Sequence, residues 1–140
     1  MLMNPWRTFQ AVDPNREYLA LLSELPLKRF RDVGLFLRYS ARIQKQLRTT
    51  KGVLGYSVGV RMLQKRFWTL SVWENEAMLY QFVGTPPHNH VMDAMSGKMG
   101  ATRFIKWQIR GADCPPTWKA AFARRDQPPG PAPSGASPRS

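Results

Sequence analysis

The sequence is poor in the residues that build disulfides and metal sites. It holds one cysteine and two histidines among its 140 residues. The single cysteine, Cys114, excludes an internal disulfide and is typical of a protein kept in a reducing cytoplasm, where we expect this chain to act. A closed zinc site takes four ligands, and these residues do not supply them at metal-binding spacing, so we predict no metal site.

Acidic residues and long apolar runs are also scarce. Nine Asp and Glu stand against 21 Lys and Arg, which gives a net charge of +12. Such a balance predicts attraction to polyanions. The basic residues are spread along the chain, however, so we interpret them as a solvated surface and expect no nucleic-acid partner. No apolar run approaches the ~18 residues of a membrane span, and the N-terminus has no signal-peptide pattern, so we expect no membrane partner.

The length and composition of the chain predict one domain. We assign residues 1–16 to an N-terminal extension and residues 17–125 to a folded α+β domain. Residues 126–140 are rich in Pro, Gly and Ser with no apolar side chain larger than alanine, and we expect them to be disordered.

Hydrophobic patterns predict four strands, at 17–25, 53–62, 67–73 and 101–110. In the second strand Leu54, Tyr56 and Val58 would share one face, and Gly55 and Gly59 would leave room on the other for a close approach. Helices are expected over 33–47 after Asp32, over 76–83 after Asn75, from Pro86 after Thr85, and after Thr117. The methionines at 92, 95 and 99 would lie in a helix core.

This order predicts a ferredoxin-like βαββαβ fold, with four antiparallel strands and two helices on one face. The other face would be apolar and uncovered. Because monomers rarely expose so large an apolar surface, we predict a homodimer whose sheets pack face to face.

The stretch "FWTLSVWENEAMLYQFVGTPPHNHVM", Phe67 to Met92, resembles the central segment of dimeric α/β-barrel proteins of the antibiotic-biosynthesis monooxygenase type. The shared features are the Trp73-Glu74 step, the Glu76-Ala77 pair, Phe82 and the histidine-containing helix. The resemblance implies a dimeric α/β barrel. It also implies oxidation of a flat aromatic compound without a cofactor.

The same family includes heme-degrading enzymes, which carry an iron-binding histidine, a tryptophan before it and an asparagine on the first strand. His88 or His90 could take the histidine position. Phe82 stands nearest the tryptophan position, and the first strand offers Ser23 or Glu24 but no asparagine. The resemblance therefore leaves heme binding open and argues against heme degradation.

The two histidines are the candidate catalytic residues. Residues two apart on a helix point about 200° away from each other, so His88 and His90 could not both bind one metal ion. One interpretation places His88 near solvent, with His90 partly buried but without a chemical role. The other makes one of them a base or ligand that lines a cavity between helix and sheet, where it could take the proton of a phenol.

The aromatic residues of the strands and helices allow two interpretations as well. They would form the core and interface, or they would line a flat pocket for an aromatic ligand. For the second case the candidate substrate-binding residues are Tyr56, Trp68, Trp73 and Phe82. A non-catalytic binding module of the same fold and an RNA-recognition domain remain alternatives, but "KRFWTLSVW" lacks the glycine and alternating aromatics of the RNA motif.

Overall fold

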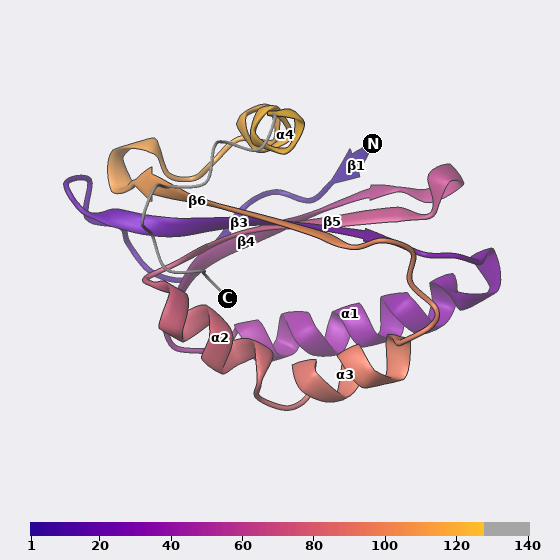
Figure 1. Ribbon diagram of the computed structural model, residues 1–140. Coiled ribbons are helices and arrows are strands. Elements are labelled where there is room, and N and C mark those ends of the chain that lie inside the picture. Colours follow the sequence, from indigo (N-terminus) through magenta and orange to yellow (C-terminus); the bar gives the residue numbers. More distant parts are fainter. Residues whose placement is uncertain (128–140) are drawn as a thin grey trace, which may run out of the picture.

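The computed structural model describes residues 1–127 and shows an α+β fold (Figure 1). Most of the predicted disordered segment, 126–140, lies outside the described residues. The strands are β1 (Leu2–Met3), β2 (Arg7–Thr8), β3 (Glu17–Pro26), β4 (Val53–Arg61), β5 (Arg66–Trp73) and β6 (Arg103–Arg110). The helices are α1 (Val33–Leu47), α2 (Glu76–Val83), α3 (His88–Met95) and α4 (Trp118–Asp126).

The four long strands form an antiparallel sheet in the order β4-β5-β3-β6. This is the ferredoxin-like order, so the predicted fold class is confirmed. The prediction of four strands was incomplete, because β1 and β2 from residues 1–16 pair with β4. The sheet of the described chain is open, and "barrel" describes it only loosely.

A bulge in β4 overturns one predicted face assignment. The pairing of β4 with β5 shifts between Val53 and Gly55. A bulge inserts one extra residue, which reverses the sides to which the flanking side chains point. Leu54 therefore packs on the face opposite Tyr56, rather than beside it.

Helices α1, α2 and α3 cover one face of the sheet (Figure 1). The Asn75 side chain caps α2, as predicted, by accepting a hydrogen bond of 2.9 Å from the Met78 amide. The predicted start of α3 was wrong: the helix begins at His88, and the Thr85 hydroxyl donates to the Gln81 carbonyl instead of capping it. Met95 is buried as expected, whereas Met92 is 51% exposed.

The opposite face is not open in the described chain. Helix α4 lies across it, and Trp118 and Phe122 of α4 pack with Trp6 on a core that includes Trp68 and Leu70. The apolar surface from which we predicted a dimer is therefore covered within one chain. The homodimer itself stays a prediction.

The two glycines of β4 explain how closely this cover approaches. A side chain at Gly55 would meet the Trp6 indole at 2.6 Å, and one at Gly59 would meet the Trp118 ring at 3.2 Å. The predicted close approach at these two positions is confirmed. Within residues 1–127, none of the helices has the length and apolar character needed to cross a bilayer.

Candidate functional site

Three of the residues singled out in the sequence meet on the side of the sheet that α1–α3 cover. The His88 ring lies edge-on to the Phe82 ring at 5.0 Å between centroids, and Phe82 in turn packs on Trp73 at 5.1 Å. Trp73 projects from the end of β5, Phe82 from the last turn of α2, and His88 from the first turn of α3. The geometry thus places an imidazole next to two aromatic rings that contact each other at an angle.

The side chain of Gln46 on α1 fixes the segment between α2 and α3. Its amide nitrogen donates to the Phe82 carbonyl at 3.3 Å and to the Thr85 carbonyl at 3.2 Å. Its amide oxygen accepts a 3.1 Å hydrogen bond from the backbone N–H of His88. One side chain therefore holds the end of α2, the loop and the start of α3 against α1.

The protonation of His88 follows from its partial burial. Loss of solvent lowers the pKa of His88, and a hydrogen bond with the Val83 backbone acts in the opposite direction. Nδ1 is buried without a partner among the described residues. With its ring proton on Nε2, a neutral His88 would present Nδ1 as a hydrogen-bond acceptor.

Tyr56 joins the same core from β4. Its hydroxyl donates to the Gln44 side-chain oxygen on α1 at 2.9 Å, and its ring stacks on Phe9 at 5.7 Å. Tyr56, Trp73 and Phe82 belong to one buried cluster. We call these three residues and His88 the His88 cluster.

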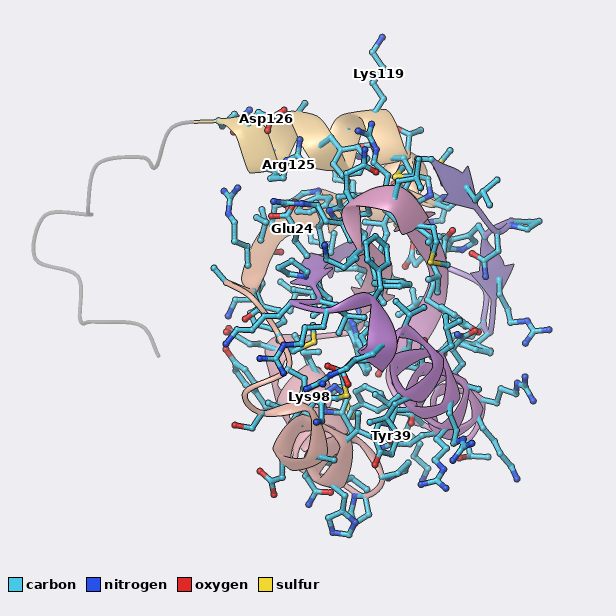
Figure 2. The ribbon with its side chains drawn as sticks, turned by 90° about the vertical axis from the view of Figure 1, so that its right-hand side faces the viewer. Glu24, Tyr39, Lys98, Lys119, Arg125 and Asp126 are labelled. Atoms are coloured by element: carbon cyan, nitrogen blue, oxygen red, sulfur yellow. The ribbon has the colours of Figure 1, made fainter. Side chains whose placement is uncertain are left out.

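Trp68 does not belong to this cluster, because it points to the other side of the sheet. Its indole nitrogen donates to the Glu24 carboxylate at 3.1 Å beneath α4. Glu24 is 4% exposed and also accepts a 3.2 Å hydrogen bond from Arg125 of α4, with Arg66 at 3.6 Å (Figure 2). This ion-pair group fastens α4 to β3. A lone acidic residue within an apolar strand was its only signal in the sequence.

Two cavities lie on the α4 side of the sheet. One, of about 250 Å³, is lined by Arg61, Gln64, Arg66, Trp68, Phe122 and Arg125. The other, of about 220 Å³, lies between the N-terminal segment and the Cys114–Pro115 loop, and Trp6, Leu54 and Val72 are part of its lining. The expected cavity between sheet and helices corresponds to neither of them.

The burial of the two histidines is the reverse of what the first interpretation predicted, namely His88 near solvent and His90 partly buried. His88 is half-buried beneath Gln46, whereas His90 is exposed on α3. Because the helix starts at His88, residues 88 and 90 point in different directions, as the helical geometry predicted. The role of Gln46 at this site was not predicted from the sequence. Its only signal was an uncharged polar residue beside Leu47 in the last turn of α1.

Heme fits these residues poorly. His88 offers one nitrogen with a free lone pair, which is suitable for iron. Phe82, however, packs against its ring, and the face of β3 toward the helices carries Ser23 rather than an asparagine. Within residues 1–127, no three His, Cys, Asp or Glu side chains are grouped so that they could hold a metal ion.

The fold and the site define a class: a ferredoxin-like protein whose helix-covered sheet face carries a histidine at the edge of an aromatic core. By sequence, the chain matches no family model and no curated protein. Solved structures do match it, and they confirm at the level of the fold the resemblance predicted from Phe67–Met92.

Three of these structures show the extent of the likeness. A proposed monooxygenase from Lactobacillus acidophilus matches with a TM-score of 0.62 and 15% identity, over 76% of this chain; the chain spans 49% of that protein. An antibiotic biosynthesis monooxygenase matches with a TM-score of 0.58 and 13% identity, over 64% of this chain and 95% of the other. SnoaB, a cofactor-independent oxygenase from Streptomyces nogalater, matches with a TM-score of 0.52 and 10% identity, over 64% and 90%. At these identities the likeness establishes the fold alone.

Proposed function

We propose that this chain is a small monooxygenase-like protein that binds and oxidises a flat aromatic compound at the His88 cluster. The observation that carries the proposal is the buried Nδ1 of His88, which has no hydrogen-bond partner within residues 1–127 and lies beside packed aromatic rings. Buried polar atoms are nearly always hydrogen-bonded, so an orphan acceptor suggests a ligand donor that completes it. The oxygenase named among the solved structures of this fold supports the same chemistry.

The chemistry that His88 can supply is proton removal. Its lowered pKa keeps the imidazole neutral at pH 7, so Nδ1 is able to accept the proton of a phenolic hydroxyl. The phenolate that forms donates an electron to dioxygen more readily than the phenol does. The substrate itself then supplies the electrons, as cofactor-independent oxygenation requires.

Access to Nδ1 depends on the loop at residues 84–87. The ring of His88 packs on Phe82, and Gln46 ties the loop to α1. A ligand that reaches Nδ1 therefore displaces Phe82 or loosens the contacts of Gln46. His90 is exposed and away from this cluster, which makes it a matched control rather than a second base.

The alternative is a non-catalytic module of the same fold that binds an aromatic ligand or heme. Among the described residues, the aromatic side chains of the cluster pack against one another, and neither of the two cavities on the α4 side is lined by them, which favours this alternative. Binding without oxygen consumption would distinguish it from the enzyme.

Oxygen uptake with a panel of polycyclic phenols tests the proposal. We expect uptake by the wild type, and a rate on the order of 100-fold lower for His88→Gln. His90→Gln should retain the wild-type rate. Tryptophan fluorescence, measured in parallel, would report binding of the same compounds.

Each other outcome has a defined meaning. Fluorescence changes without oxygen uptake would support the binding module, and a Soret shift on heme addition that His88→Gln abolishes would support its heme-binding form. If uptake occurs and His88→Gln leaves it unchanged, His88 is not the proton acceptor and the proposed site is wrong.

A further inference from the structure

Three loops meet at one end of the molecule, the right-hand end of Figure 1, which faces the viewer in Figure 2. They are residues 27–32 between β3 and α1, residues 61–66 at the turn from the end of β4 into the start of β5, and residues 96–100 before β6. The Leu27 amide donates to the Lys65 carbonyl at 2.8 Å, and the Lys28 amide donates to the Lys98 carbonyl at 3.0 Å. Segments distant in sequence therefore form one continuous surface, which we call the loop end.

The loop end is strongly basic. The first two loops carry Lys28, Arg29, Arg31, Arg61, Lys65 and Arg66, and the third adds Lys98. Against these seven positive charges the three segments hold one acidic residue, Asp32. Most of the basic side chains are exposed, including Lys28, Arg29 and Arg61.

Large apolar side chains stand among these charges. Leu63 is 84% exposed at the tip of the β4–β5 hairpin, and its neighbour Met62 is 43% exposed. Phe30, from the adjacent loop, is 56% exposed, and the Lys65 ammonium lies 4.4 Å from the centre of its ring. The apolar side chains at the tips of two neighbouring loops, together with the basic side chains around them, form a surface that is both hydrophobic and positively charged.

We propose that the loop end docks on the surface of an anionic lipid bilayer. The basic side chains would lie at the level of the negatively charged headgroups, which attract clusters of Lys and Arg. Phe30, Met62 and Leu63 would enter the boundary between headgroups and acyl chains, where apolar side chains leave water. The contact is peripheral and needs no spanning helix. It revises the expectation of no membrane partner, which rested on the lack of such a span.

The exposed apolar tips favour a bilayer over nucleic acid. Both partners would be attracted by the charge and released by salt. Recognition of single-stranded nucleic acid uses aromatic platforms, however, and gains nothing from an exposed leucine and methionine at a hairpin tip. Removal of these two side chains should therefore weaken binding to a bilayer but not to nucleic acid, which distinguishes the two kinds of partner.

Co-sedimentation of the full chain with vesicles tests the proposal. We expect binding to vesicles of phosphatidylcholine with phosphatidylserine, and little binding to phosphatidylcholine alone. The double variant Met62→Ser/Leu63→Ser should partition on the order of tenfold more weakly, and Lys28→Ala/Arg29→Ala should weaken binding as well. Met92→Ser, on exposed α3, and Lys119→Ala, on α4, are the matched controls and should bind as the wild type.

A second measurement uses a mixed-sequence oligonucleotide labelled with a fluorophore. The proposal would be overturned if the Met62→Ser/Leu63→Ser variant bound both the oligonucleotide and the anionic vesicles as tightly as the wild type does. That result would indicate a general surface for polyanions. Failure of the wild type to bind anionic vesicles at low salt would overturn it outright. Circular dichroism of each variant, equal to that of the wild type, excludes loss of folding as the cause.

Discussion

At the scale of single residues, His88 combines two features that cost stability. It is half-buried, which penalises its charged form, and its Nδ1 has no hydrogen-bond partner in the part of the chain that the structure describes. An unsatisfied buried polar atom costs about 1–3 kcal/mol. His90, two residues further on in the same helix, is exposed.

The burial of His88 predicts a pH dependence of folding. The pKa of His88 is lower in the folded chain than the ordinary value of 6.5, so the unfolded chain binds the proton first as the pH falls. The contribution of His88 to the free energy of unfolding should therefore be fully present above about pH 6.5, and it should be lost as the pH falls below that value. Urea unfolding between pH 5 and pH 7.5 measures this. His88→Gln should lose less stability than the wild type over that range. Equal slopes for the two proteins would contradict the lowered pKa.

At the scale of elements, the junction of α2 with α3 depends on one glutamine. α3 has no side-chain cap, and the loop before it is held by the amide of Gln46 from α1. Hydrogen bonds of this kind contribute about 0.5–1.5 kcal/mol each, and a carbonyl left without its donor costs more when it is buried. The position of His88 is thus set by a residue 42 positions earlier in the chain.

The variant Gln46→Met keeps the volume of the side chain and removes its hydrogen bonds. We expect a loss of about 1–3 kcal/mol in the free energy of unfolding and faster hydrogen exchange at the amides of His88 and Val91. Gln44→Met is the control: it removes the bond to the Tyr56 hydroxyl and should leave exchange in α3 unchanged. Exchange in α3 that is equally fast in both variants would show that Gln46 does not hold the junction.

At the scale of the whole molecule, α4 decides what the sheet presents to solvent. Trp68, Leu70 and Trp107 are all at most 9% exposed because α4 and the N-terminal segment lie over them. The ion pair of Arg125 with buried Glu24 adds a polar anchor to this apolar contact. A second copy of the chain is therefore not needed to bury this face, and a homodimer would use another surface or displace α4.

Loss of the cover should produce self-association. The variant Trp118→Ser/Phe122→Ser weakens the contacts of α4 with the sheet. The apolar face that becomes exposed should then bind a second copy of the chain. Sedimentation velocity at micromolar concentration should show larger species for this variant than for the wild type. If the two proteins sediment alike, α4 does not control association through this face. The exposed pair Lys119→Ser/Ala123→Ser, on the same helix, is the matched control.

The sequence by itself determined the four long strands, the existence of the helices and the order of these elements. Alternation of apolar residues identified β5, in which Trp68 and Trp73 fall on opposite faces as predicted, and the cap at Asn75 located α2. These signals are local, so a single chain reveals them. Gly55 and Gly59 even indicated that something would approach β4 closely, although not that Trp6 and Trp118 would do so.

Only the tertiary structure decided what the elements bring together. The bulge that turns Leu54 away from Tyr56, the amide of Gln46 at His88 and the cover provided by α4 depend on contacts between distant segments. Seven of the 21 basic residues, which are spread along the sequence, gather at the loop end for the same reason. Periodicity and capping are properties of neighbours in the chain, whereas a site is a property of neighbours in space, and the register of the sheet is what converts one into the other.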